Sequence, residues 1–88
     1  MRKITEKKLI ELGWEKQIVE PEIKPNEDSF YYFTYEINGK TILITNANND
    51  RIGKGFDVEF FDFPYIIIKD LKKLKKLMKI IKSCFNGE

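Results

Sequence analysis

Residues 30–46 read FYYFTYEINGKTILITN, and this stretch decides the fold. Asn38-Gly39 separates two runs of aromatic and β-branched residues, which is a strong signal for a two-residue hairpin turn because both turn positions need a positive φ. A two-residue turn also fixes the register of the strands that it joins. The core face of the hairpin is therefore expected to carry the opposed pairs Ile37–Lys40, Tyr35–Ile42 and Phe33–Ile44. The other face is expected to pair Glu36 with Thr41, Thr34 with Leu43 and Tyr32 with Thr45.

The segment before the hairpin predicts a short helix and a strand. Thr5 is a suitable N-cap, Ile4 can pack on Leu9 as a hydrophobic staple, and Gly13 stands where a helix ends. Residues 14–19 then have the pattern of a strand. Residues 20–29, with two prolines and four acidic residues, are expected to form a loop.

The segment after the hairpin predicts a further strand and a long helix. Residues 56–63 alternate, with Phe56, Val58 and Phe60 expected to face the core. Pro64 ends or bulges this strand, and residues 65–68 read either as a short edge strand or as the approach to the last helix. Asp70 is expected to cap that helix, whose apolar side carries Leu71, Leu74, Leu77, Met78 and Ile81.

The order of elements is α-β-β-β-β-α, and strands that follow each other closely usually pair antiparallel. We therefore expect an α+β fold, with residues 1–88 forming a single domain. Its sheet is an antiparallel meander of about four strands, with the N-terminal and C-terminal helices packed on one face. The opposite sheet face is then left open to solvent or to a partner.

Composition excludes several classes of function. The 88 residues include one cysteine, Cys84, and no histidine, so no disulfide within the chain, no histidine base and no histidine metal cluster can form. We therefore expect no metal, no cofactor and no catalytic residue, and the protein is interpreted as a non-enzyme. The longest apolar stretch, residues 63–68, is far shorter than the ~20 residues that span a bilayer. Without a signal-peptide pattern, the protein is expected to be cytoplasmic.

Charge is distributed unevenly along the chain. Residues 1–68 carry nine Lys or Arg and twelve Asp or Glu, whereas residues 69–88 carry seven and two. The last helix places lysines on the side opposite its apolar stripe. A lysine row of this kind could lie along a phosphate backbone, so nucleic-acid binding is the alternative function. The residues expected to carry it are Lys72, Lys73, Lys75, Lys76 and Lys79. A solvated helix face is the simpler interpretation of the same lysines.

The open sheet face is the candidate partner-binding site. Apolar side chains surrounded by carboxylates suit a protein partner better than nucleic acid, because the carboxylates repel phosphate. The residues expected to contact a partner protein are Tyr32, Glu36, Asp57, Glu59 and Phe61. Self-association into a homodimer through the same face explains the pattern equally well. Residues 46–55, rich in Asn and Gly, read as an ordinary loop or as a cradle for a small anionic ligand.

The opening ITEKKLIELGW (residues 4–14) resembles that of small accessory proteins of phages, prophages and mobile elements in AT-rich bacteria. The FYYFTYEINGK hairpin and the closing LKKLKKL helix extend this resemblance over most of the chain. The resemblance implies no catalytic residues. It implies a class in which some members block host defence proteins by binding them. The leading hypothesis is therefore a docking inhibitor of a host protein, such as a defence nuclease, similar in action to anti-CRISPR proteins.

Overall fold

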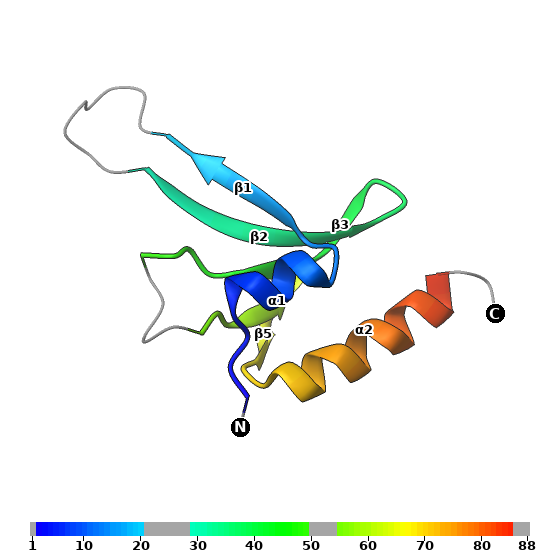
Figure 1. Ribbon diagram of the computed structural model, residues 1–88. Helices are drawn as coiled ribbons and strands as arrows, with labels where there is room; N and C mark the ends of the chain where they lie inside the picture. The colour runs from blue at the N-terminus through cyan, green and yellow to red at the C-terminus, as the bar shows by residue number, and fades with distance from the viewer. Residues whose placement is uncertain (1, 21–28, 50–54, 86–88) are drawn as a thin grey trace.

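The computed structural model describes residues 2–20, 29–49 and 55–85. The helices are α1 (Glu6–Glu11) and α2 (Leu71–Phe85). The strands are β1 (Glu15–Val19), β2 (Phe30–Ile37), β3 (Lys40–Thr45), β4 (Val58–Phe60) and β5 (Phe63–Ile68). Each strand pairs antiparallel with the next, so the sheet is a meander in the order β1-β2-β3-β4-β5 (Figure 1).

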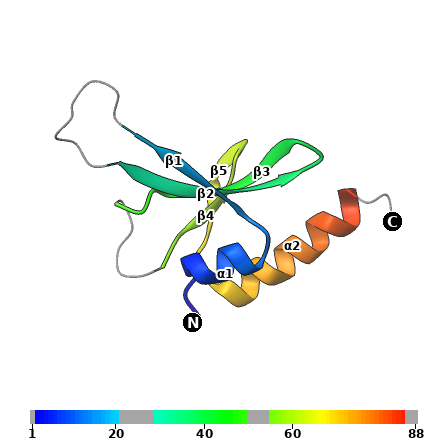
Figure 2. The same ribbon diagram turned by 45° about the horizontal axis from the view of Figure 1, so that its top comes forward.

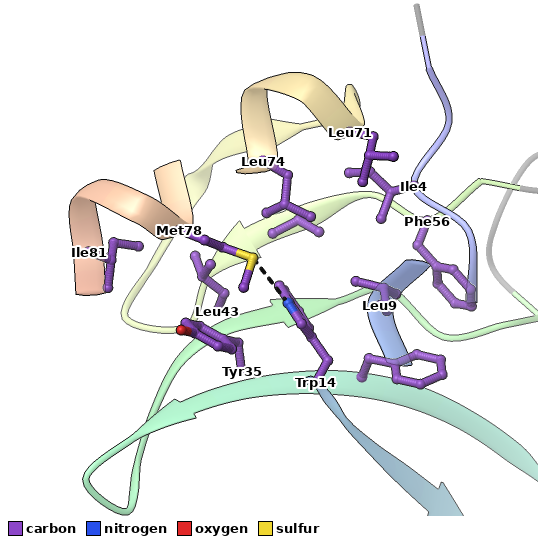
Figure 3. Close-up of a cluster of buried hydrophobic side chains, with 12 residues drawn as sticks. Ile4, Leu9, Trp14, Tyr35, Leu43, Phe56, Leu71, Leu74, Met78 and Ile81 are labelled. Carbon is purple, nitrogen blue, oxygen red and sulfur yellow. Dashed lines mark hydrogen bonds between the residues drawn. The ribbon is translucent and has the colours of Figure 1, made fainter. Parts of the chain in front are cut away.

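Both helices lie on the same face of the sheet (Figures 1 and 2). One hydrophobic core fills the space between the two layers. Its buried members are Ile4, Leu9, Trp14, Phe33, Tyr35, Leu43, Phe56, Val58, Leu71, Leu74, Met78 and Ile81 (Figure 3). The predicted α+β class and the placement of both helices on one face are confirmed, and the sheet has five strands where about four were expected.

The start of the chain follows the local signals in its sequence. The Thr5 hydroxyl accepts the Lys8 N–H at 3.3 Å, and Ile4 and Leu9 are both fully buried in the core. At the other end of α1, Gly13 has φ 88° and donates to the Ile10 carbonyl, while Trp14 donates to the Leu9 carbonyl. This pair of bonds is a Schellman motif, so Gly13 both ends the helix and turns Trp14 into the core.

The turn of the central hairpin forms as predicted. Asn38 and Gly39 have φ 54° and 79°, and next to them Ile37 pairs with Lys40 and Glu36 with Thr41. These are the positive φ values that a two-residue hairpin turn requires.

Beyond the first two pairs, the predicted register is wrong. A β-bulge inserts Ile42 as an extra residue, so that Tyr35 pairs with Leu43 instead of Ile42, and Thr34 pairs with Ile44. Leu43, expected on the open face, is fully buried, and Ile44 takes its place on that face. The Ile42 carbonyl accepts the Phe61 N–H at 3.0 Å, so the bulge also anchors the turn after β4.

The predicted strand over residues 56–63 divides into two. β4 ends at Phe60, Phe61 and Asp62 form a turn, and β5 returns along the outer side of β4. Phe61 therefore lies in a turn, whereas the sequence placed it on the flat of a strand. Of the two interpretations of residues 65–68, the edge strand is the one that forms, and Pro64 is tolerated in it because the outer side of an edge strand has no ladder to interrupt.

Asp70 caps α2 and ties the N-terminal segment to the start of this helix. Its carboxylate accepts the Arg2 N–H at 3.0 Å and the Lys73 N–H at 3.3 Å, and the Arg2 carbonyl accepts the Leu71 N–H at 2.9 Å. The Arg2 N–H contributes most to holding the pKa of Asp70 below its usual 3.8, and the Lys73 N–H and the nearby positive charges lower it further against a partial loss of solvation.

Replacement of Asp70 should therefore destabilise the protein in a pH-dependent way. Because the folded-state pKa lies below the unfolded value, the carboxylate contributes stability above about pH 4, and this contribution is lost as the pH falls through the folded-state pKa. We expect Asp70→Ala to lower the melting temperature at pH 7, and the difference from wild type to shrink at pH 2.5. Melting curves by circular dichroism test this, with Asp70→Asn, which keeps an acceptor but not the charge, as control. A difference that grows on acidification would contradict it.

Candidate protein-docking surface

The sheet face that points away from α1 and α2, here called the open face, is crossed by one straight row of residues. The register of the ladders places one residue of each strand in this row. In the order of the strands they are Glu15, Thr34, Ile44, Glu59 and Ile67. Among the described residues no helix covers this face (Figure 2). The row alternates carboxylate and aliphatic side chains across β3, β4 and β5.

The structure places four of the five predicted contact residues on this open face. Glu59 lies in the row, between Ile44 and Ile67, and is half-buried. Tyr32 and Glu36 lie on β2, two residues before and two residues after Thr34, with Tyr32 half-buried and Glu36 exposed. Whether these residues bind a partner stays a prediction.

Asp57 lies on the same face, two residues before Glu59, and two hydrogen bonds from and to Asn46 fix its main chain. The Asn46 N–H donates to its carbonyl at 3.2 Å, and its own N–H donates to the Asn46 Oδ1 at 3.1 Å. Its carboxylate lies 3.7 Å from the Lys69 Nζ, and both side chains are well exposed. An exposed ion pair of this kind contributes little stability, so the carboxylate stays accessible to a partner.

Phe61 is the fifth predicted residue and lies at the border of the open face, in the β4–β5 turn. Its side chain is 53% exposed. Beyond Asp62 follows a run of exposed apolar residues that the sequence interpretation missed, formed by Phe63, Pro64, Tyr65, Ile66 and Ile67. These residues belong to the longest apolar stretch of the sequence, residues 63–68, but such a stretch more often indicates a buried strand than an exposed one. Only the position of β5 at the sheet edge explains its exposure.

Opposite charges collect on opposite sides of the molecule. The open face carries Glu15, Glu36, Asp57 and Glu59, and the positive charge beside them, Lys69, is paired with Asp57. The outer side of α2 carries the exposed lysines Lys72, Lys73, Lys75, Lys76, Lys79 and Lys82. A partner of the open face should therefore present a basic or apolar surface.

The predicted nucleic-acid residues share the solvent-facing side of α2. Lys72, Lys73, Lys75, Lys76 and Lys79 are all exposed. At the start of the helix, Arg2 joins two of them beside a cleft of about 310 Å³ that is lined by Arg2, Leu71, Lys72 and Lys75. The N-terminal segment thus adds to the lysine row a positive charge that the sequence pattern did not include.

The Asn-rich segment 46–55 is described only in part, because residues 50–54 lie outside the described ranges, and with them most of the expected anion cradle. The described part is structural. The Asn48 Oδ1 accepts the Tyr31 N–H at 2.7 Å, and the Asn46 amide holds Asp57. In the described ranges no group of three acidic or cysteine side chains is arranged to hold a metal ion.

Comparison of the chain with protein-family models, with curated proteins and with solved structures finds no match. Within the part of the chain that the structure describes, neither helix has the length and apolar character needed to cross a membrane.

Proposed function

We propose that this protein is a small, non-enzymatic binding module whose open face docks on a host protein and blocks it. The observation that carries the proposal is a sheet face that neither described helix covers, on which Tyr32, Ile44 and Ile67 lie among carboxylates. Apolar area next to acidic groups is complementary to a basic protein surface, such as the nucleic-acid site of a defence nuclease. In this proposal the protein is encoded by a phage or mobile element and acts in the cytoplasm of a bacterial host.

The experiment is capture of the host partner with two matched charge-reversal variants. One variant, Glu36→Lys with Glu59→Lys, changes the open face, and the other, Lys72→Glu with Lys76→Glu, changes α2. We expect the tagged wild type to retain one host protein at about equal molar amount from nuclease-treated lysate. The open-face variant should reduce that amount at least tenfold, whereas the α2 variant should keep it.

Inhibition is tested on the retained protein itself. Titration of its purified form with the wild-type chain should abolish its activity near a one-to-one ratio, and the open-face variant should need a much higher concentration. Retention that survives the open-face reversal, or a bound protein whose activity does not change, would contradict the proposal.

Nucleic-acid binding through α2 is the second candidate function. It is favoured by the cleft in which Arg2 lies beside Lys72 and Lys75, at one end of the row of exposed lysines. Cations that neutralise phosphates release counterions, so affinity should fall steeply as salt rises.

Fluorescence anisotropy with a labelled duplex measures this candidate directly. If it is correct, the wild type binds at 50 mM salt and loses affinity at 200 mM, by at least about tenfold for two or more phosphate contacts. The variant Lys72→Glu with Lys75→Glu should not bind, and Glu36→Lys should bind at least as tightly as wild type. Binding that does not depend on salt, or that survives the lysine reversal, excludes this candidate.

A further inference from the structure

A positively charged cleft lies where the N-terminal segment runs beside the start of α2 (Figure 1). Its volume is about 310 Å³, and the described residues that line it are Arg2, Leu71, Lys72 and Lys75. Leu71 is buried, whereas the three cationic residues are exposed. None of the described residues that line the cleft is acidic, so three positive charges share one concave surface.

The fold fixes the positions from which these three side chains extend. The Arg2 N–H donates to the Asp70 Oδ1 at 3.0 Å, and the Arg2 carbonyl accepts the Leu71 N–H at 2.9 Å. Both bonds are made by the main chain of Arg2, so its guanidinium takes no part in holding the segment to the helix. Lys72 and Lys75 are three residues apart on α2 and are therefore neighbours on one side of it.

The three cations of the cleft have no ion-pair partner among the described residues. The lysines that do form ion pairs in the described ranges are Lys8, Lys16 and Lys69. Asp70 is the carboxylate next to the cleft in sequence, but its two oxygens accept the N–H groups of Arg2 and Lys73. Like charges that are neighbours on a helix repel each other and lower its stability. A bound anion would offset this repulsion.

We propose that this cleft binds a diphosphate group, either as free pyrophosphate or as part of a nucleotide. A guanidinium fork and ammonium groups are the side-chain groups that recognise phosphate oxygens. A diphosphate carries more negative charge than a single phosphate and therefore suits three cations better. The volume of the cleft lies at the lower end of the range for small-molecule sites, about 300–1,000 Å³.

The site is distinct from both candidate functions described above. Docking on a host protein uses the open face, whereas the cleft is formed by α2 and the segment before α1. Nucleic-acid binding uses the whole row of exposed lysines on α2, whereas a diphosphate contacts only the two lysines of the cleft. Failure of either candidate function therefore leaves this proposal standing, and the reverse also holds.

The first test is isothermal titration calorimetry of the wild-type chain with pyrophosphate, ADP and inorganic phosphate. It is carried out at 150 mM salt, where exposed charges farther apart than about 8 Å are largely screened. We expect pyrophosphate and ADP to bind with dissociation constants below about 1 mM. Inorganic phosphate should bind at least about tenfold more weakly, because it reaches fewer of the cations. Tighter binding of ADP than of pyrophosphate would assign the site to a nucleotide, and the opposite order to the free anion.

Two variants with the same loss of charge then locate the site. Arg2→Gln with Lys75→Gln removes two cations from the cleft and keeps both main-chain bonds of residue 2. Lys79→Gln with Lys82→Gln removes two exposed lysines farther along α2, which do not line the cleft. We expect the dissociation constant for pyrophosphate to rise at least about tenfold in the cleft variant. In the control variant it should change by less than about threefold.

A second experiment needs no variant. NMR titration of the wild type with pyrophosphate should shift the amide signals of Leu71, Lys72 and Lys75 in a saturable way, and leave those of Glu36 and Glu59 on the open face unchanged. The proposal would be overturned if pyrophosphate did not bind at about 1 mM, or if ADP bound and pyrophosphate did not. Equal losses of affinity in the two variants would also overturn it, because they would indicate diffuse attraction to the lysines of α2.

Discussion

Leu43→Ala is expected to lower the free energy of unfolding by about 2–5 kcal/mol, whereas Ile44→Ala should cost about 1 kcal/mol. The two residues are neighbours on β3, but Leu43 is fully buried in the core and Ile44 lies half-buried on the open face. Truncation of Leu43 leaves a cavity between the sheet and α2, in addition to the lost burial. A chain of this size has only some 4–13 kcal/mol of stability, so this one change removes a large part of it.

Urea denaturation followed by circular dichroism measures both costs, with equal slopes required for a valid comparison. The pair tests the bulge directly. If β3 paired with β2 without the extra residue Ile42, Leu43 would lie on the open face and Ile44 in the core. An Ile44→Ala cost equal to or larger than that of Leu43→Ala would contradict the bulged register.

The bulge also shows where the sequence stops being informative about the fold. The Asn38-Gly39 turn, the caps of both helices and the α+β meander follow from local signals, because each depends on a few neighbouring residues. The register of β3 depends on alternation between apolar and polar residues, and Ile42-Leu43-Ile44 is apolar throughout. A slip of one residue therefore leaves no trace in the pattern.

The division of the predicted strand over residues 56–63 has a similar cause. Phe61 and Asp62 form the β4–β5 turn without the Gly or Asn that usually announces one. In the sequence the segment therefore reads as one strand followed by Pro64. The turn is instead set by a long-range contact, the bond from the Phe61 N–H to the Ile42 carbonyl. This contact becomes visible only once the bulge is known.

The candidate site was likewise predictable from the sequence only in part. Tyr32, Glu36, Asp57 and Glu59 could be assigned to one face from alternation, because the acidic positions alternate with core residues on β2 and β4. Their order across the sheet could not be assigned, because it needs the register of β3 and β5. The exposure of β5 could not be predicted for another reason. It depends on the position of this strand at the edge of the sheet, which its own residues do not reveal.

Trp14→Ala is expected to cost about 3–5 kcal/mol, because Trp14 joins three elements of the core. Its indole stacks on the Tyr35 ring with centroids 5.6 Å apart, and its Nε1–H donates to the Met78 Sδ at 3.4 Å (Figure 3). The side chain is 5% exposed, so a donor without a partner there would lose its hydrogen bond without gaining one to water. The junction of α1 and β1 is thereby fixed to both β2 and α2.

A double-mutant cycle separates the packing of Trp14 from its hydrogen bond. Met78→Leu conserves volume but removes the acceptor, so in the Trp14 background we expect a loss of about 1–3 kcal/mol. In a Trp14→Phe background there is no N–H to leave unpaired, and the same change should cost less than about 1 kcal/mol. Urea denaturation followed by circular dichroism gives all four free energies. Equal costs of Met78→Leu in both backgrounds would show that the N–H···S contact adds nothing, and that Trp14 stabilises the core by burial and stacking alone.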